Sequence, residues 1–194
     1  MIRIPDAAVF RSTCGRGGAI NADDSSSLSL YDSRLLGCTA TSSGPAGGGA
    51  IYLGKTSQLT LDSVSNLECA VRSDSYSVGG GGIDADSGSE VLATSTLISG
   101  CRAESASSLG SGGGLRLYGI SAVTLTLHRT NISRCVASSS GGAIFAIIGF
   151  ILFDNETVLS GAFLQDVPCA SCVRGGATVA RLALCGHTCK QCMV

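Results

Sequence analysis

The chain has 194 residues and a formal net charge of −1, and only 14% of its residues are charged. This balance excludes electrostatic binding of nucleic acid or of an anionic membrane, and low charge with positive mean hydropathy excludes an intrinsically disordered chain. The 27 glycines, the absence of tryptophan and an aromatic share of 5% fit tight, repeated turns better than a bulky globular core.

The N-terminal segment Met1–Asp6 lacks the apolar core of a signal peptide. Cys14 stands just before the first glycine string, as if a repeat began upstream, so we expect the chain to be part of a longer protein. The longest apolar run, residues 143–153, is too short to cross a bilayer as a helix. Because both faces of this run are apolar, we expect the C-terminal tail, a partner chain or a continuation of the fold to cover it.

Five glycine strings recur along the chain at a nearly fixed period. Their closing apolar residues lie 31, 32, 32 and 29 residues apart. A fixed period of this length is the signature of a solenoid. The strings are Gly17–Ile20, Gly48–Ile51, Gly81–Ile83, Gly112–Leu115 and Gly141–Ile144.

Each repeat holds three short segments in which apolar and polar residues alternate. In the second repeat these segments are residues 50–53, 58–62 and 67–71, and no helical period is sustained. Equal spacing favours stacking of each strand on its own copy in the next repeat. We therefore predict an all-β fold, a right-handed single-stranded parallel β-helix of about five rungs of about 31 residues. It would occupy residues 1–165, and residues 166–194 would form a short cysteine-rich tail.

Stacking would place equivalent residues of successive rungs in inward columns. The expected columns are Ile20, Ile51, Ile83, Leu115 and Ile144; Leu28, Leu59, Val91 and Val123; Leu30, Leu61, Ala93 and Leu125; Cys38, Cys69, Cys101 and Cys135; and Ala40, Val71, Ala103 and Ala137. The glycines would serve as bends that need a positive φ or a close approach of two backbones. They are Gly17, Gly18, Gly48, Gly49, Gly81, Gly82, Gly113, Gly114, Gly141 and Gly142.

The Gly-Gly-Ala-Ile strings at Gly17–Ile20, Gly48–Ile51 and Gly141–Ile144 resemble the polymorphic outer-membrane protein repeats of chlamydial surface proteins. The resemblance covers the repeats and implies a β-helical passenger of a surface or adhesin-like protein. The repeats also resemble those of large eukaryotic surface proteins. The companion motif of the family, Phe-x-x-Asn, does not occur in this chain.

The column of Cys38, Cys69, Cys101 and Cys135 has a structural and a functional interpretation. Buried cysteine packs as a small hydrophobic residue, so we expect a ladder of inert thiols. Metal binding and redox activity are the functional alternatives. Parallel strands orient neighbouring Cβ atoms alike, which disfavours disulfides between rungs.

The tail concentrates five of the ten cysteines in 24 residues. Their spacing fits either a zinc site or a small disulfide-stapled extracellular module, and the surface-type repeats favour disulfides. The five are Cys169, Cys172, Cys185, Cys189 and Cys192, and we interpret His187 between them as a solvated loop residue.

Asp84 and Asp86 are the best acid pair for catalysis, because both alternate with inward residues and would point outward, with Asp84 facing Arg116 of the next rung. A solvated acidic patch, or weak calcium binding by the two carboxylates, explains the pair equally well. Asn131 and Asn155 stand in N-glycosylation sequons, which matter if the source secretes the protein through a glycosylating pathway.

We expect a non-catalytic structural or adhesive module of a cell-surface or secreted repeat protein, located outside the cell or at its surface. It would need no cofactor, and its partner would be a cell-surface glycan or protein. The alternatives are a β-helical carbohydrate-active enzyme similar to pectate lyases, or a polysaccharide binder. A flat ice- or polysaccharide-binding face would need regular threonine ranks, and Thr60, Thr94 and Thr126 do not repeat strictly enough.

Overall fold

The structure, a computed structural model, describes residues 2–5, 8–10, 13–14, 16–43, 46–74, 76–106, 110–147 and 149–160. These residues form short β-strands and no helix, and neighbouring strands in every sheet are parallel. The prediction of an all-β parallel β-helix is therefore confirmed. The cysteine-rich tail predicted for residues 166–194 lies outside the described residues.

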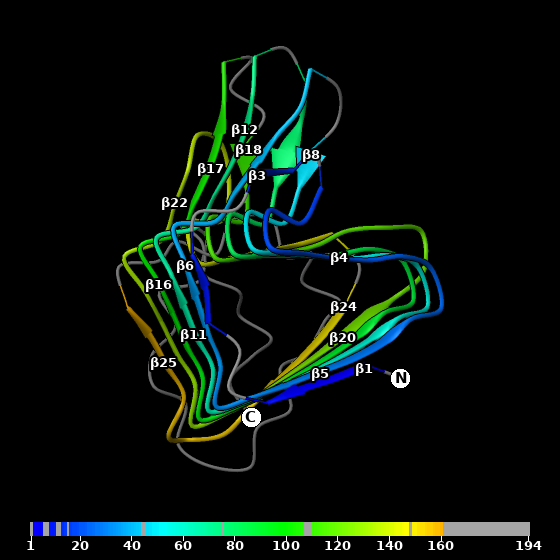
Figure 1. Ribbon diagram of the computed structural model, residues 1–194, viewed down its shortest axis with the longest axis vertical. Coiled ribbons are helices and arrows are strands. Elements are labelled where there is room, and N and C mark those ends of the chain that lie inside the picture. The colour runs from blue at the N-terminus through cyan, green and yellow to red at the C-terminus, as the bar shows by residue number, and fades with distance from the viewer. Residues whose placement is uncertain are drawn as a thin grey trace, which may run out of the picture.

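Each turn of the solenoid, called a rung here, passes through five sheets (Figure 1). Three sheets enclose a triangular main core, and the other two form an arm that projects from the triangle. The base sheet contains β1 (Ile2–Pro5), β5 (Ser27–Tyr31), β10 (Gln58–Asp62), β15 (Glu90–Thr94), β20 (Val123–His128) and β24 (Gly149–Phe153). The side sheet contains β2 (Ala8–Phe10), β6 (Arg34–Leu36), β11 (Ser65–Leu67), β16 (Leu97–Ser99), β21 (Asn131–Ser133) and β25 (Val158–Ser160). The upper sheet contains β4 (Ile20–Ala22), β9 (Ile51–Leu53), β14 (Ile83–Ala85), β19 (Leu115–Leu117) and β23 (Ile144–Ala146).

The arm consists of two narrow sheets that pack on each other. The outer arm sheet contains β3 (Thr13–Cys14), β7 (Thr39–Thr41), β12 (Ala70–Ser73), β17 (Arg102–Ser105) and β22 (Val136–Ala137). The inner arm sheet contains β8 (Ala46–Gly47), β13 (Val78–Gly79) and β18 (Gly110–Ser111). Small apolar side chains fill the space between them, namely Ala40, Ala46, Val71, Val78, Ala103 and Ala137. Because these side chains are short, the two sheets of the arm lie close together.

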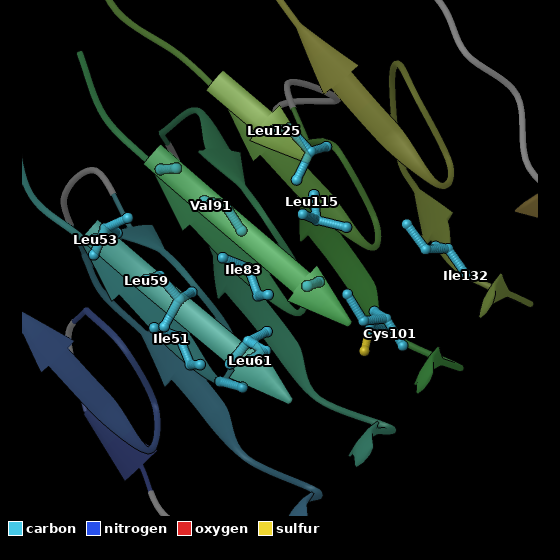
Figure 2. Close-up of a cluster of buried hydrophobic side chains, with 14 of the residues drawn as sticks. Ile51, Leu53, Leu59, Leu61, Ile83, Val91, Cys101, Leu115, Leu125 and Ile132 are labelled. Carbon is cyan, nitrogen blue, oxygen red and sulfur yellow. The ribbon is translucent and has the colours of Figure 1, made fainter. Parts of the chain in front are cut away.

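Inward residues of successive rungs stack on one another in the main core (Figure 2). Ile51, Ile83 and Leu115 are in register on β9, β14 and β19, and all three are completely buried. Leu59 and Val91 stack in the same way on the base sheet. Each side chain in a column packs against its own counterpart above and below, which explains why the columns keep their apolar character from rung to rung.

The fourth rung departs from the expected columns. We expected Val123 to stack on Val91, but Leu125 does so. Leu117 and Thr124 pair with Ala85 and Glu90 of the third rung. Between them the chain has six residues (118–123), two more than the four residues (86–89) of the third rung. The chain regains its register on β20, and Cys135 therefore returns to the cysteine column. The longer spacing between the fourth glycine string and Cys135 therefore arises in this longer turn, and Cys135 itself is in register.

Left-handed corner residues divide each rung more finely than the sequence indicated. We expected one strand over residues 67–71 with Leu67 facing inward, but β11 ends at Leu67 and β12 begins at Ala70. Between them Glu68 has a φ of 56°, and the equivalent corners at Gly37, Gly100 and Arg134 also have positive φ. The bend shifts the alternation, so Asn66 is buried and Leu67 is half-buried. The three strands expected in each repeat are therefore five.

The glycine strings form the corner between the inner arm sheet and the upper sheet. Gly48 has a φ of 67°, and Gly17, Gly112 and Gly141 occupy the same left-handed region. Gly49 has no room for a Cβ, because that atom would collide with the carbonyl oxygen of Gly81 in the next rung. In the third rung the bend lies at Gly80, one residue before the pair Gly81–Gly82 that the sequence comparison aligned.

The last described rung carries apolar residues on both faces of β24, as the run at residues 143–153 indicated. Ile151 and Phe153 pack against the main core. On the outer face, Phe150 is 57% exposed and Leu152 is 39% exposed.

Candidate binding crevice

The arm and the upper sheet enclose a crevice on the outside of the solenoid. Figure 1 shows the arm, with β8, β12, β17 and β18, projecting from the main triangle beside the sheet that begins with β4. The pocket in this angle has a volume of about 270 Å³, and we call it the corner crevice. Its lining residues are Arg16, Ala46, Gly47, Tyr52, Ser77, Asp84, Asp86, Arg116 and Tyr118.

Two rows of residues face each other across the corner crevice. On the upper sheet, the outward residues Tyr52, Asp84 and Arg116 are in register on β9, β14 and β19. On the inner arm sheet, Gly47 and Gly79 are in register on β8 and β13. A Cβ on Gly47 would collide with the Asp84 carboxylate, and a Cβ on Gly79 would collide with the Arg116 side chain. These two glycines therefore provide room for a charged row, which distinguishes them from the glycines of the bends.

Asp84 and Arg116 form a buried ion pair at the centre of the crevice. Arg116 donates from Nε to Asp84 Oδ1 over 2.8 Å and from Nη2 to Asp84 Oδ2 over 2.6 Å. The arginine side chain is 14% exposed and the aspartate side chain 3% exposed. The expected contact between the two residues is present, but Asp84 does not belong to a solvated acidic patch. The arm covers it.

Burial and pairing act in opposite directions on the two charges. Burial raises the pKa of Asp84 above its ordinary value, and the Arg116 guanidinium opposes that shift. Burial also disfavours the charge of Arg116, but the attraction of Asp84 holds the pKa of Arg116 above its ordinary value. Because arginine keeps its proton in proteins, the two-point geometry is that of an ionic pair.

A second group of side chains lies beside this ion pair. The Arg16 guanidinium lies over the Tyr52 ring, 5.0 Å from its centroid, and Arg16 Nη1 donates to the Tyr52 hydroxyl over 3.4 Å. The same hydroxyl donates to Asp86 Oδ2 over 3.4 Å. Burial raises the pKa of Tyr52, so the phenol keeps its proton. At the other end of the crevice, the Tyr118 ring lies against Arg116, 5.2 Å from ring centroid to guanidinium carbon.

Three of the four carboxylate oxygens of the crevice accept short hydrogen bonds from the protein, and Asp86 Oδ2 has only the 3.4 Å contact with Tyr52. Arg116 occupies both oxygens of Asp84. Asp86 Oδ1 accepts hydrogen bonds from the backbone N–H and the hydroxyl of Ser87, at 2.6 and 3.1 Å. A general acid or base needs an oxygen that is directed at the substrate, and a nucleophile needs a free lone pair. The arrangement therefore suits binding by preformed polar groups better than proton transfer.

The calcium interpretation of Asp84 and Asp86 finds little support in this geometry. Calcium takes at least six oxygen ligands, several of them from carboxylates. In the described ranges, no three His, Cys, Asp or Glu side chains are grouped so that they could hold a metal ion. Arg116 also supplies the positive charge that Asp84 would otherwise need.

The sequence pattern did not identify Arg16, Tyr52, Ser77 or Tyr118 as site residues. One signal for the crevice was present, however. The outward row of the upper sheet changes its chemistry at every rung, whereas the inward column of the same strands stays aliphatic. That row consists of Asn21, Tyr52, Asp84, Arg116 and Phe145.

The cysteine column lies inside the main core and not in the crevice. Cys38, Cys69, Cys101 and Cys135 are all buried and carry thiols, not disulfides. Their sulfurs lie near backbone carbonyl oxygens; Cys69 Sγ, for example, donates to Leu67 O over 3.4 Å. Hydrogen bonds to Cys135 and Cys69, and then burial, raise the pKa of Cys101. Hydrogen bonds with Cys101 and Cys38 lower the pKa of Cys69 to about 4, and a hydrogen bond with Cys101 lowers the pKa of Cys135. All four side chains pack in the main core, which fits the structural interpretation of the column.

The glycosylation candidates lie on the surface. Asn131 on β21 and Asn155 after β24 are both exposed. In the second sequon, Thr157 Oγ1 donates to Asp154 Oδ1 over 2.8 Å, which fixes the turn that presents Asn155. The candidate ligands of the tail, Cys169 to Cys192, lie outside the described residues.

Within the part of the chain that the structure describes, no helix is long and apolar enough to cross a membrane. Comparison of the chain with known protein families, with curated proteins and with solved structures finds no match.

Proposed function

We propose that the chain is a non-catalytic structural and adhesive module of a repeat protein that is secreted or displayed at the cell surface. The observation that carries this proposal is the state of the crevice carboxylates. Asp84 and Asp86 would be the acids of a β-helical enzyme, but Arg116 holds both oxygens of Asp84 and the Ser87 backbone N–H holds Oδ1 of Asp86. The stacked rungs form a wall with the recessed polar corner crevice, which supports recognition of a partner.

The alternative, a β-helical carbohydrate-active enzyme, draws support from the same crevice. Two acids of one rung and two arginines of other rungs converge there, as a polysaccharide-cleaving site would require. Against it stands the burial of Asp84, which is 2% exposed and faces its partner arginine. An acid so placed cannot reach a glycosidic oxygen unless the ion pair opens.

The proposed location at the cell surface rests on the resemblance of the glycine strings to surface-protein repeats and on the solenoid itself. Solenoids present long walls to their partners, and the charge balance of this chain leaves them free of strong non-specific electrostatic binding. The partner would be a glycan or a protein on another cell. Antibodies raised against the purified chain should label intact cells of the source organism, and labelling that requires permeabilised cells would contradict the location.

Adhesion and turnover can be measured on one preparation of the 194-residue chain. Beads coated with the folded protein should attach to cultured epithelial cells, and beads coated with heat-unfolded protein serve as the control. The same protein should release no reducing ends and no unsaturated uronides from polygalacturonate, xylan or hyaluronan. Attachment no better than the control would overturn the adhesive function. Release of sugar products would overturn the non-catalytic one.

A further inference from the structure

We propose that the corner crevice binds a single neutral saccharide unit, for example the terminal residue of a surface glycan. This inference deepens the adhesive function proposed above and rests on it. Four observations support it, namely the charge balance of the lining, the unequal lengths of its hydrogen bonds, the position of the longer turn of the fourth rung, and the size of the pocket.

The charges that line the crevice cancel. Arg16 and Arg116 contribute two positive charges, and Asp84 and Asp86 contribute two negative charges. An acidic sugar would need a surplus of positive charge to offset the loss of water from its carboxylate. A neutral sugar has hydroxyl groups that both donate and accept hydrogen bonds, so it can satisfy guanidinium and carboxylate groups at the same time. The balanced lining therefore favours a neutral ligand.

The hydrogen bonds of the lining fall into a short set and a long set. The ion pair of Asp84 and Arg116 is held at 2.6 and 2.8 Å, which makes it a fixed frame. The Tyr52 hydroxyl contacts both Arg16 and Asp86 only at 3.4 Å, beyond the usual range for such bonds. Tyr52 and Asp86 can therefore strengthen their hydrogen bonding by accepting a ligand hydroxyl between them. The two hydrogen bonds of the ion pair use Nε and Nη2 of Arg116 and do not involve its Nη1.

The longer turn of the fourth rung lies at the mouth of the crevice. It begins at Tyr118, which is 49% exposed, and continues to Ile120, which is 91% exposed. Ser87 Oγ accepts a hydrogen bond from the Ile120 backbone N–H over 3.0 Å, so the turn is tied to the residue that follows Asp86. Insertions in solenoids commonly line the binding face. Here the turn brings an aromatic ring, suited to the apolar face of a sugar, next to the polar lining.

The size of the pocket limits the ligand to a small group. Its volume of about 270 Å³ is near the lower end for ligand sites, and the arm closes one side. A single sugar ring fits such a space, whereas a long polysaccharide would lie across an open wall. We therefore expect recognition of a chain end or a branch.

Nuclear magnetic resonance titration of the isotopically labelled chain tests the inference directly. The probes are the methyl glycosides of glucose, galactose, mannose and N-acetylglucosamine, with galacturonate as the acidic comparison, each raised to about 20 mM. At least one neutral glycoside should shift the resonances of Tyr118 and the Arg116 Nε–H group, with a Kd of about 1 mM. No shift with any of the four glycosides, or tighter binding of galacturonate than of all four, would overturn the proposal.

Two variants place the binding in the crevice. Tyr118→Ala and Asp86→Asn should each weaken binding of the responsive glycoside about tenfold. Tyr31→Ala, on the base sheet, is the matched control and should leave Kd unchanged. Thermal unfolding of all three variants checks that they remain folded. Binding that survives both crevice variants would place the site elsewhere and contradict the inference.

The titration and the bead assay fail independently. If folded beads attach to cells and no glycoside shifts the crevice resonances, the adhesive function stands and the saccharide inference is wrong. If a glycoside binds in the crevice and the beads do not attach, the saccharide site stands and the adhesive function is wrong.

Discussion

The main core and the corner crevice occupy opposite faces of the same strands, and they follow opposite rules. On β14, Ile83 faces the core and belongs to a column in which every residue is a large aliphatic one. Its neighbour Asp84 faces the crevice, between Tyr52 and Arg116. An inward residue packs against the equivalent residues of the rungs above and below, so the same kind of side chain repeats. An outward residue of the upper sheet faces the arm and the crevice, so the kind of side chain can differ from rung to rung. On this sheet the variation from rung to rung is confined to the face that lines the crevice.

The largest expected effect comes from breaking the ion pair of the crevice. Arg116→Ala leaves the Asp84 carboxylate buried without its charged partner. We expect the free energy of unfolding to fall by about 3–5 kcal/mol, because an uncompensated buried charge costs that much. Equilibrium unfolding in urea measures it.

A paired replacement distinguishes the charge from its role in folding. Asp84→Leu combined with Arg116→Met removes both charges and fills a similar space. We expect this double variant to unfold within about 1 kcal/mol of the natural protein, since apolar side chains need no partner. A double variant as unstable as Arg116→Ala would show that the crevice pair is as necessary for the fold as a core column is.

The next effect concerns the main core. Leu61 on β10 is completely buried, and Leu61→Ala should lower the free energy of unfolding by about 3 kcal/mol through the cavity it leaves. Thr60→Ala, one residue earlier and on the outward face, should change it by less than about 0.5 kcal/mol. Urea unfolding of the two variants compares the faces of one strand. Equal losses of stability in the two variants would contradict the conclusion that only the inward face of β10 contributes to the core.

The main core could be predicted from the sequence because its cause is local and repeated. Ile51, Ile83 and Leu115 recur at one period, and a period dictates what stacks on what. The fourth rung was misaligned because the glycine string alone set the expected register there, whereas the two extra residues within 118–123 shift it.

The arm and the crevice could not be predicted in the same way. The strands β8 and β13 are two residues long, Ala46–Gly47 and Val78–Gly79, and such segments look like loops in a sequence. Whether Asp84 is solvated depends on the angle between the arm and the upper sheet. The alternation of apolar and polar residues does not predict that angle. The crevice also joins residues as far apart as Arg16 and Tyr118, so their proximity follows only from the closed path of the rung.

A smaller effect is expected where a polar residue has entered a core column. Asn66 is in register with Leu35 and Ile98, and its Nδ2 is buried with no hydrogen-bond partner in the described residues. Asn66→Leu should raise the free energy of unfolding by about 1–2 kcal/mol, because it removes a buried N–H group without a partner at the cost of one weak bond from the Cys101 thiol to Asn66 Oδ1. Asn131→Leu, at an exposed site on the same sheet, serves as the control and should be neutral in urea unfolding. A destabilised Asn66→Leu protein would mean that the amide has an essential partner.

The smallest effect concerns a corner that serves neither the core nor the crevice. Glu68 is exposed and has a φ of 56°, and two other rungs place Gly37 and Gly100 at the equivalent corner. Glu68→Gly removes the steric cost of holding a side chain in the left-handed conformation. This gain exceeds the free energy lost because glycine gives the unfolded chain more conformational entropy. We expect a gain of about 0.5 kcal/mol in urea unfolding. Glu90→Gly in β15 should instead lose about 1 kcal/mol, since strand geometry needs no glycine. An equal loss of stability in both variants would contradict this prediction. It would mean that the left-handed conformation at Glu68 does not favour glycine, and that the bend there is not what separates β11 from β12.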